Sequence, residues 1–273
     1  MAFLGSLSPL LTLSWLWQIK EWRWDRLLEH LRREGWVGQL WGEIRSSVVG
    51  IYAAGVMVGW LHGWMVSEGV IVLMLSIVTG LGLMQVILRK QRRPVPTKKA
   101  ITVTGTAALL TLIVTIVVSI MGFNVLLPFI ILLQPVMIAC AWLLWWPVDS
   151  VLKARIMQKA RALRNSHSDM TVIGVTGSVG KTTTKELIAC VLKDLKPDVT
   201  PAYVNSEIGV ANWLSDKLRI TDYGLRESKS EIRNPKLFVV EMGAYQKGEI
   251  ALMCSFVKPT LGVVTMVGTQ HIA

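Results

Sequence analysis

Cysteine is scarce in this sequence, and the few cysteines form no pattern. Cys140, Cys190 and Cys254 stand alone, without the CxxC spacing of zinc sites or redox motifs. A disulfide framework or a cysteine metal site is therefore not expected. The plain prediction is three buried free thiols in a reducing compartment.

Charge is also sparse, and acidic charge more so than basic. Charged residues make up 17% of the chain against 52% hydrophobic residues, with a mean hydropathy of +0.48. That composition argues against an ordinary soluble domain. The net charge of +11 does not by itself indicate a nucleic acid partner, and none is expected. Much of the basic excess lies in loops beside apolar runs, where it indicates membrane topology.

Four apolar windows are long enough to span a bilayer, which takes ~20 residues. They are residues 48–66, 69–88, 101–121 and 125–146. A fifth window, 3–17, is short and contains Pro9, so spanning and partial insertion both stay open. We therefore predict a transmembrane helical region of four or five segments over residues 1–148.

The loops between these windows predict their orientation. Residues 89–99 carry six basic side chains and no acidic one, whereas 67–69 and 122–124 carry no basic residue. Because positive loops stay in the cytoplasm, the chain should leave residue 146 on the cytoplasmic side, where ATP is available. A multi-pass protein of the cytoplasmic membrane with its C-terminal part in the cytoplasm is predicted.

The predicted spans hold almost no ionisable side chains, His62 being one of the few. Pumps and carriers usually need such groups, so an anchor, or a platform for a lipid-borne partner, is favoured over a transporter. Gly55, Gly59 and Gly63 recur four residues apart. Either they share a helix face and permit close helix contact, or they lie in the span without a role.

Two basic segments have helical spacing. Residues 20–36 place Trp24, Leu27, Leu28 and Leu31 on one face among arginines, which fits an interfacial helix or a helix packed in the cytosol. Residues 149–169 form a basic linker helix, either drawn to anionic headgroups or simply solvated.

From residue 170 onward, apolar strand patterns alternate with helical ones. The stretches TVIGV, LFVVEMG and LGVVTMV read as strands, DVTPAYV as a further candidate strand, and the segments between them as helices. Such alternation predicts an α/β domain whose parallel sheet is covered on both faces.

The loop GVTGSVGKTTTKE, residues 174–186, has the residues of a phosphate-binding loop between a strand and a helix. Gly177 and Gly180 let backbone amides point inward at phosphate oxygens. Lys181 would reach the β- and γ-phosphates, and the Thr182 hydroxyl would bind Mg²⁺. The pattern departs from GxxxxGK[ST], because Val175 stands where the first glycine is expected.

Three further stretches follow this loop in order: NSEIGV (205–210), VVEMGAYQKGEIALM (239–253) and KPTLGVVTMVGTQHIA (258–273). Together with the loop they resemble the Mur ligases, most strongly the dipeptide-adding branch of that family, across residues 171–273. The apolar windows predict a membrane α-helical bundle. The resemblance implies that this bundle is followed by part of a P-loop parallel-sheet domain of the Mur ligase central type, over residues 170–273.

The resemblance also implies roles for individual residues. ATP would be held by Gly177, Ser178, Val179, Gly180, Lys181, Thr182 and Thr183. Mg²⁺ would be bound by Thr182, Glu241 and His271, and the catalytic residues would be Lys181, Glu241 and His271. Asn205 and Glu207 would lie near the acceptor substrate, although Ser206 replaces the family's second Asn.

Enzymes of this family phosphorylate a carboxylate with ATP, and an amine then attacks the acyl-phosphate. Lysine, Mg²⁺ and backbone amides offset the negative charge that gathers in that step. The resemblance thus implies a bacterial cell-wall ligase that adds an amino acid or dipeptide to a muramyl peptide precursor, UDP-linked or lipid-linked.

Two departures from the family pattern qualify this expectation. The sequence ends at Ala273, whereas family members continue with a carbamoylated lysine, further strands and an amine-binding domain, so the sequence should be an incomplete enzyme. Apolar segments stand where the family has a UDP-sugar domain. Two alternatives stay open: a membrane-associated regulatory P-loop NTPase, because GKTTT also occurs in signal-recognition GTPases and partitioning ATPases, and a non-catalytic ATP-binding fragment.

Overall fold

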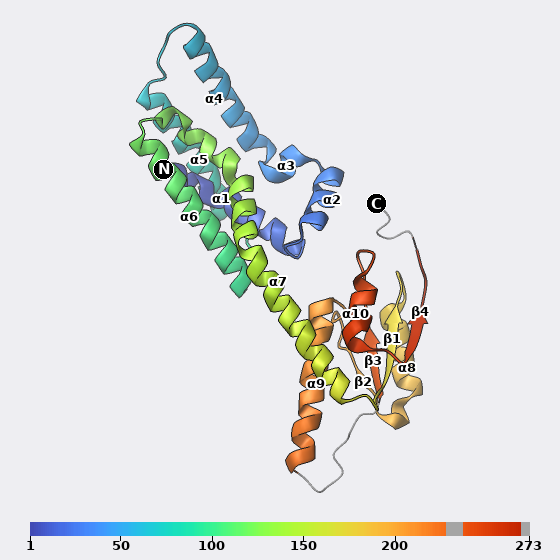
Figure 1. The fold of residues 1–273 in the computed structure, drawn as a ribbon. Coiled ribbons are helices and arrows are strands. Elements are labelled where there is room, and N and C mark those ends of the chain that lie inside the picture. Colours follow the sequence, from blue (N-terminus) through green and yellow to red (C-terminus); the bar gives the residue numbers. More distant parts are fainter. Residues whose placement is uncertain (228–236, 269–273) are drawn as a thin grey trace. The chain divides into compact units, whose positions relative to one another are not determined.

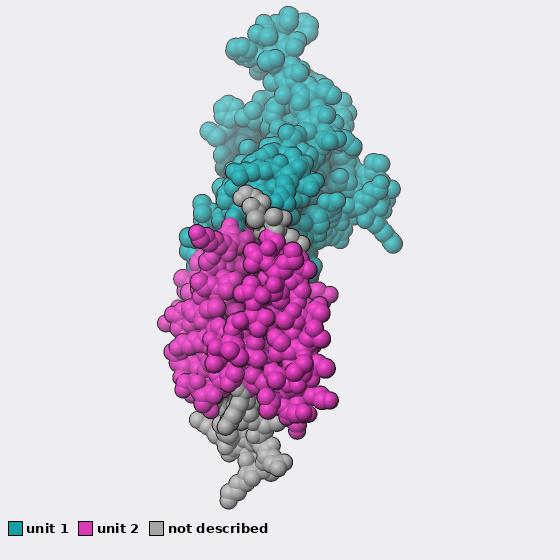
Figure 2. Space-filling view, turned by 90° about the vertical axis from the view of Figure 1, so that its right-hand side faces the viewer, with its two compact units in different colours: residues 1–147 teal, residues 148–273 magenta. Residues whose placement is uncertain are grey.

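The computed structural model describes residues 1–227 and 237–268. The chain divides into two compact units, residues 1–147 and 148–273 (Figure 2). Each unit has its own hydrophobic core. Figure 1 shows helices alone in the first unit and a sheet with helices in the second.

The first unit is entirely helical in the described residues. Its elements are α1 (Ala2–Ile19), α2 (Trp24–Glu34), α3 (Trp36–Leu40), α4 (Glu43–Leu61), α5 (Glu68–Ile87), α6 (Lys98–Ile120), the 3-10 helix η1 (Asn124–Leu133) and the first part of α7 (Gln134–Ser166). Four stretches are long and apolar enough to cross a membrane, namely α4, α5, α6 and the continuous run of η1 and α7. They overlap the four predicted windows.

Helix α1, the uncertain fifth window, lies at the centre of the first unit. Its Leu10, Leu13 and Trp17 are at most 2% exposed and pack in one core with residues of α2, α6 and α7. It is not one of the four long apolar stretches. Pro9 lies inside the helix without ending it. Burial among other helices accounts for both the apolar character and the short length of this segment.

The α1–α2 corner is held by aromatic rings and ion pairs. Trp17 and Trp142 lie 5.2 Å apart between ring centroids, and Trp142 donates its indole N–H to the Trp22 carbonyl oxygen at 2.9 Å. Arg26 forms an ion pair with Glu21. Of the predicted apolar face of α2, Leu27 and Leu31 are buried but Trp24 is 44% exposed, so only part of that face packs inward.

The structure corrects the predicted glycine face and shows that the predicted linker helix is part of a longer helix. Helix α4 ends at Leu61, and Gly63 has φ +71°, so it does not share a helix face with Gly55 and Gly59. The last apolar window and the predicted linker helix are continuous, because α7 runs unbroken from Gln134 to Ser166 through Pro147.

The second unit contains β1 (Thr171–Thr176), α8 (Lys181–Val191), the 3-10 turn η2 (Lys193–Leu195), β2 (Asp198–Val199), α9 (Glu207–Glu227), β3 (Leu237–Glu241), α10 (Glu249–Val257) and β4 (Leu261–Val264). The strands form one parallel sheet in the order β2-β3-β1-β4. The predicted α/β class is therefore confirmed. The candidate strand DVTPAYV pairs over only two residues.

Successive side chains of each strand point to opposite faces of the sheet, so the strands contribute to two hydrophobic cores. Val172, Phe238 and Val240 pack against helices α9, α10 and the end of α7. Ile173, Val175 and Val239 face the other way, toward Ile188 and Leu192 at the end of α8. The sheet is thus covered on both faces, and its β1 and β3 are almost fully buried.

The cysteines differ from their prediction. All three are free thiols, as expected, but Cys140 and Cys190 are exposed and Cys254 is half-buried. Each lies on a helix, and the faces that carry Cys140 and Cys190 point away from the cores.

Arg164, at the end of α7, ties that helix to the sheet domain. It is 4% exposed, and its guanidinium donates to the Val257 carbonyl at 3.1 Å and to the Met170 carbonyl at 3.0 Å, as well as to that of His167. These carbonyls belong to the end of α10 and to the turn before β1. One buried side chain therefore satisfies several backbone acceptors at once.

Replacing Arg164 with methionine should destabilise the second unit by about 3 kcal/mol, because buried carbonyl oxygens lose their charge-assisted hydrogen bonds and are left without a donor. Arg155→Met, an exposed position on the same helix, should cost no more than about 0.5 kcal/mol. Pulse proteolysis of the full chain across a urea gradient measures both. Equal losses for the two variants would contradict the role of Arg164.

Candidate functional site

The candidate site begins where β1 ends, in the loop that leads into α8. Gly177 has φ +140° and Gly180 has φ +83°, and Gly180 is the N-cap of α8. Both conformations favour glycine. The loop therefore turns sharply from strand to helix and leaves the first amides of α8 without intrahelical partners, which is the arrangement that binds phosphate.

The segment after β4 braces this loop. The Ser178 amide donates to the Met266 carbonyl at 2.6 Å, and Thr265 Oγ1 donates to the Val179 carbonyl at 2.7 Å. A Cβ on Gly177 would stand 2.1 Å from Thr265 Oγ1 and 3.0 Å from the Met266 carbonyl oxygen. Position 177 therefore requires glycine for two reasons: its positive φ, and the close approach of Thr265 and Met266, which leaves no room for a Cβ.

Lys181 opens α8 and folds back over the loop. Its Nζ donates to the Gly177 carbonyl at 2.6 Å and to the Ser178 carbonyl at 3.2 Å. The ammonium is therefore held at the loop that would receive the phosphates. Thr182 and Thr183 follow in the first turn, and both are exposed.

Glu241 is the acidic centre of the site. It is the last residue of β3 and is only 3% exposed. Its carboxylate accepts from Thr182 Oγ1 at 3.0 and 3.2 Å and from Asn205 Nδ2 at 3.3 Å. Three residues that are distant in sequence therefore meet at adjacent strand ends, the edge at which open parallel sheets keep their sites.

Lys185 also belongs to this cluster, and sequence analysis missed it. Its side chain is fully buried. Its Nζ lies 3.5 Å from Glu241 Oε2 and donates to the Thr200 carbonyl at 2.8 Å. The available signal was its spacing of three and four residues from Thr182 and Lys181, which puts all three on neighbouring positions of one helix face. The motif drew attention to the phosphate loop alone.

Thr182 and Glu241 fit the requirements of a magnesium ion. Adjacent ligands of an octahedral Mg²⁺ at 2.0–2.1 Å stand about 3 Å apart, and the Thr182 hydroxyl and Glu241 carboxylate are separated by 3.0 Å. The described residues contain no group of three or more His, Cys, Asp or Glu arranged for a metal. Two protein oxygens are nevertheless a usual share for Mg²⁺, which takes its other ligands from phosphates and water.

The three remaining predicted site residues differ in where they lie relative to Glu241. Asn205 reaches Glu241, and its carbonyl accepts from the Gly243 amide at 2.8 Å. Glu207 opens α9, and in the described chain no hydrogen bond joins it to Glu241. His271 lies outside the described residues.

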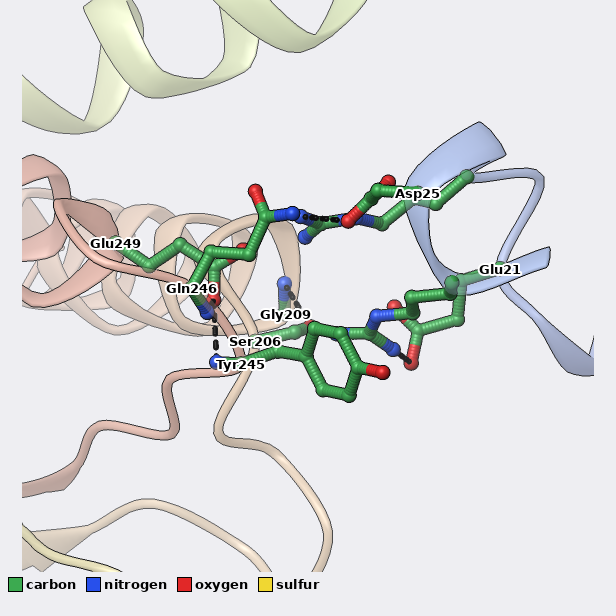
Figure 3. A network of polar contacts seen from close by, with 9 residues as sticks. Glu21, Asp25, Ser206, Gly209, Tyr245, Gln246 and Glu249 are labelled. Carbon is green, nitrogen blue, oxygen red and sulfur yellow. Dashed lines mark hydrogen bonds and ion pairs between the residues drawn. The ribbon is translucent and has the colours of Figure 1, made fainter. Parts of the chain in front are cut away.

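Two neighbouring segments have structural tasks. Ser206 Oγ accepts a hydrogen bond from the Gly209 amide at 3.4 Å, and this bond closes a turn at the start of α9 (Figure 3). The Glu249 carboxylate accepts from the Tyr245 and Gln246 amides at 2.6 and 3.1 Å and so closes the turn before α10 (Figure 3). The stretch from Tyr245 to Glu249 therefore orders the chain just beyond Glu241.

Comparison with known proteins agrees with this geometry. Residues 175–273 match the Mur ligase middle domain. A Synechocystis protein named UDP-N-acetylmuramoyl-tripeptide--D-alanyl-D-alanine ligase is 44% identical over 102 residues, which cover 37% of this chain and 19% of that protein. A Mycobacterium leprae protein of the same name is 36% identical over 117 residues, which cover 42% of this chain and 20% of that protein. A Bacillus subtilis protein of the same name is 37% identical over 125 residues, which cover 45% of this chain and 24% of that protein.

The match thus spans about a fifth of the length of these relatives. No solved structure is a significant match. Sheet, loop and strand-end carboxylate together define a domain of the phosphate-binding-loop class. Residues 175–273 match the Mur ligase middle domain in sequence, so the predicted resemblance is confirmed.

Gly177→Ala should weaken ATP binding by about tenfold or more, because strain at a positive φ costs ~1–3 kcal/mol before the clash with Thr265 is counted. Gly262→Ala is the matched control, since a Cβ there meets nothing within 4 Å and its φ is ordinary. Isothermal titration of the full chain with ATP and Mg²⁺ measures both. Unchanged affinity in Gly177→Ala would exclude this loop as the phosphate site.

Lys185→Met should destabilise the second unit by about 3 kcal/mol, because it leaves the buried Glu241 without its cation. The double variant Lys185→Met with Glu241→Gln should cost clearly less than the sum of the single changes, since the two groups interact. Pulse proteolysis supplies the four free energies of this cycle. Simple additivity would show that the pair is not coupled.

Proposed function

We propose that the chain acts in an ATP-dependent ligase of cell-wall precursor synthesis that forms an amide bond through an acyl-phosphate. The observation that carries the proposal is the meeting of the phosphate loop with Glu241 through Thr182. The relatives are named as ligases of UDP-N-acetylmuramoyl-tripeptide with D-alanyl-D-alanine, and these names supply the substrate class.

In the proposed reaction a carboxylate oxygen of the precursor attacks the γ-phosphorus of ATP. The bond between that phosphorus and the bridging oxygen breaks, and ADP leaves. The amine of an amino acid or dipeptide then attacks the acyl carbon, loses a proton and displaces phosphate, so an amide, ADP and phosphate are the products.

The chain's own groups would serve the first of these steps. The α8 amides and Lys181 hold the phosphates and offset the charge that gathers as phosphoryl transfer proceeds. Thr182 and Glu241 would hold Mg²⁺, which supplies Lewis-acid stabilisation of the phosphoryl oxygens when bound. Lys185 and Asn205 orient the Glu241 carboxylate. His271 is proposed as a further metal-site residue.

The first unit is proposed to lie in the bacterial cytoplasmic membrane, with the second unit in the cytoplasm. Four stretches have the necessary length and hydropathy. Large apolar side chains on them are exposed, among them Trp60 at 79%, Ile87 at 78% and Ile120 at 81%, and lipid would cover these surfaces. A membrane-held ligase would work beside envelope precursors, so the proposed acceptor is a lipid-linked muramyl peptide.

The test is ADP release by the full-length native protein in nanodiscs. ADP release over many turnovers should require a muramyl-tripeptide carboxylate and D-alanyl-D-alanine together, because without the amine the reaction stops at the acyl-phosphate. Lys181→Ala should lower the rate by about 100-fold or more, the scale of losing one preorganised charge partner of the transition state. Thr183→Ser keeps the hydroxyl and should remain active.

The outcomes separate the candidate functions. ADP release that ignores the amine would favour a regulatory NTPase. ATP binding without turnover under any substrate combination would favour a non-catalytic binder. Turnover on a soluble UDP-linked tripeptide with none on its lipid-linked counterpart would overturn the lipid-linked acceptor and leave the ligase chemistry intact.

A further inference from the structure

The first unit contains a small polar cavity that the ligase chemistry does not use. It has a volume of about 180 Å³, well above the ~10–15 Å³ that a single water requires. Its lining includes Thr12, Gly42, Arg45, Gln85, Lys90 and Arg92. We call it the basic cavity, because three of these side chains are cationic and none of the described lining residues is acidic.

Arg45 is the most constrained cation of the basic cavity. It is 8% exposed, and its Nη2 donates to Gln85 Oε1 at 2.6 Å and to Ser8 Oγ at 2.7 Å. Its Nε is buried and has no hydrogen-bond partner among the described residues. Within the described chain no carboxylate pairs with this guanidinium. Glu43 lies two positions earlier on α4 and so on another face. A buried charge with a free donor requires an explanation.

The other two cations of the basic cavity, Lys90 and Arg92, are exposed residues of the segment that follows α5. Arg92 lies over the Trp15 ring, 4.6 Å from its centroid. The Lys90 amide donates to the Gln85 carbonyl at 2.9 Å. Between them Gln91 donates to the Ser8 carbonyl and to Thr12 Oγ1, each at 3.1 Å. The basic segment after α5 is therefore fastened to α1 through Gln91, and its Lys90 and Arg92 line the basic cavity.

The α4 N-terminus adds to the positive field. Gly42 is the N-cap of this 19-residue helix and supplies no side-chain cap. The first amides of α4 thus have no intrahelical partners and carry the positive end of the helix dipole. A guanidinium, two further cations and a helix N-terminus match a phosphate group, whose oxygens accept several charge-assisted hydrogen bonds at once.

The position of the basic cavity indicates where such a phosphate comes from. Besides residues of α1 and α3, the lining comes from the start of α4 and the end of α5, the ends of two apolar stretches, and from the basic loop 89–99. On the membrane placement proposed above, on which this inference rests, that level is the layer of lipid headgroups. We propose that the basic cavity binds the terminal phosphate, a phosphomonoester or diphosphate, of a membrane lipid.

The test is native mass spectrometry of the full chain in detergent, titrated with short-chain phosphatidic acid, a phosphomonoester lipid. Phosphatidylglycerol, a phosphodiester, should bind more weakly. Arg45→Gln and Lys90→Gln should each weaken phosphatidic acid binding by about tenfold, the loss expected from one charge-assisted hydrogen bond. Arg93→Gln is the matched control, because Arg93 lies in the same loop but does not line the basic cavity.

Each binding result either supports or overturns the proposed lipid-phosphate site. Selective loss in Arg45→Gln and Lys90→Gln, or in Lys90→Gln alone if the Arg45 variant does not fold, supports the site. Equal loss in Arg93→Gln would mean non-specific attraction and overturn it. Inorganic phosphate that competes as well as the lipid would overturn the lipid source. Because the readout is binding, it is independent of whether the ligase reaction occurs.

Discussion

The parallel pairing of β1 with β3 is the constraint on which the second unit depends. Their register places Val175, at the start of the phosphate loop, directly opposite Glu241. Helix α8 leaves β1 at that same level, so Thr182 and Lys185 meet the carboxylate from one helix face. A slip of one residue would turn Glu241 to the other face of the sheet and separate the phosphate loop from its acidic partner.

The Glu241 cluster also shows how a buried carboxylate is kept in an apolar domain. Its charge is compensated by Lys185 and by hydrogen bonds from Thr182 and Asn205, which offset the loss of hydration. Lys185 is itself anchored to the Thr200 carbonyl. The groups are therefore oriented before any ligand arrives, and such preorganisation is what makes charge stabilisation effective in phosphoryl chemistry.

Arg45 in the first unit presents the opposite case. It is nearly as buried as Glu241, yet its hydrogen-bond partners in the described chain are a neutral hydroxyl and a neutral amide. Glu241 is thus compensated by a buried cation, whereas Arg45 lines a cavity and keeps its Nε without a hydrogen-bond partner in the described chain. That contrast is the physical reason to expect an external anion at the basic cavity, with phosphate chemistry in both units.

The sequence by itself determined the features that local patterns encode. Alternating strands and helices, the loop around Gly177 and Lys181, and the four long apolar stretches all follow from short-range periodicity and glycine placement. Tertiary structure decided the rest. Lys185 has the sequence context of an ordinary lysine on an amphipathic helix, yet it is buried beside Glu241 at the end of β3. Helix α1 is a core helix because neighbouring helices bury it. Helix α7 continues through Pro147, where local rules predict a break. Helical spacing could place Lys185 beside Thr182 on one face. Its burial and its pairing with Glu241 depend on residues distant in the chain, so the local pattern could not show them.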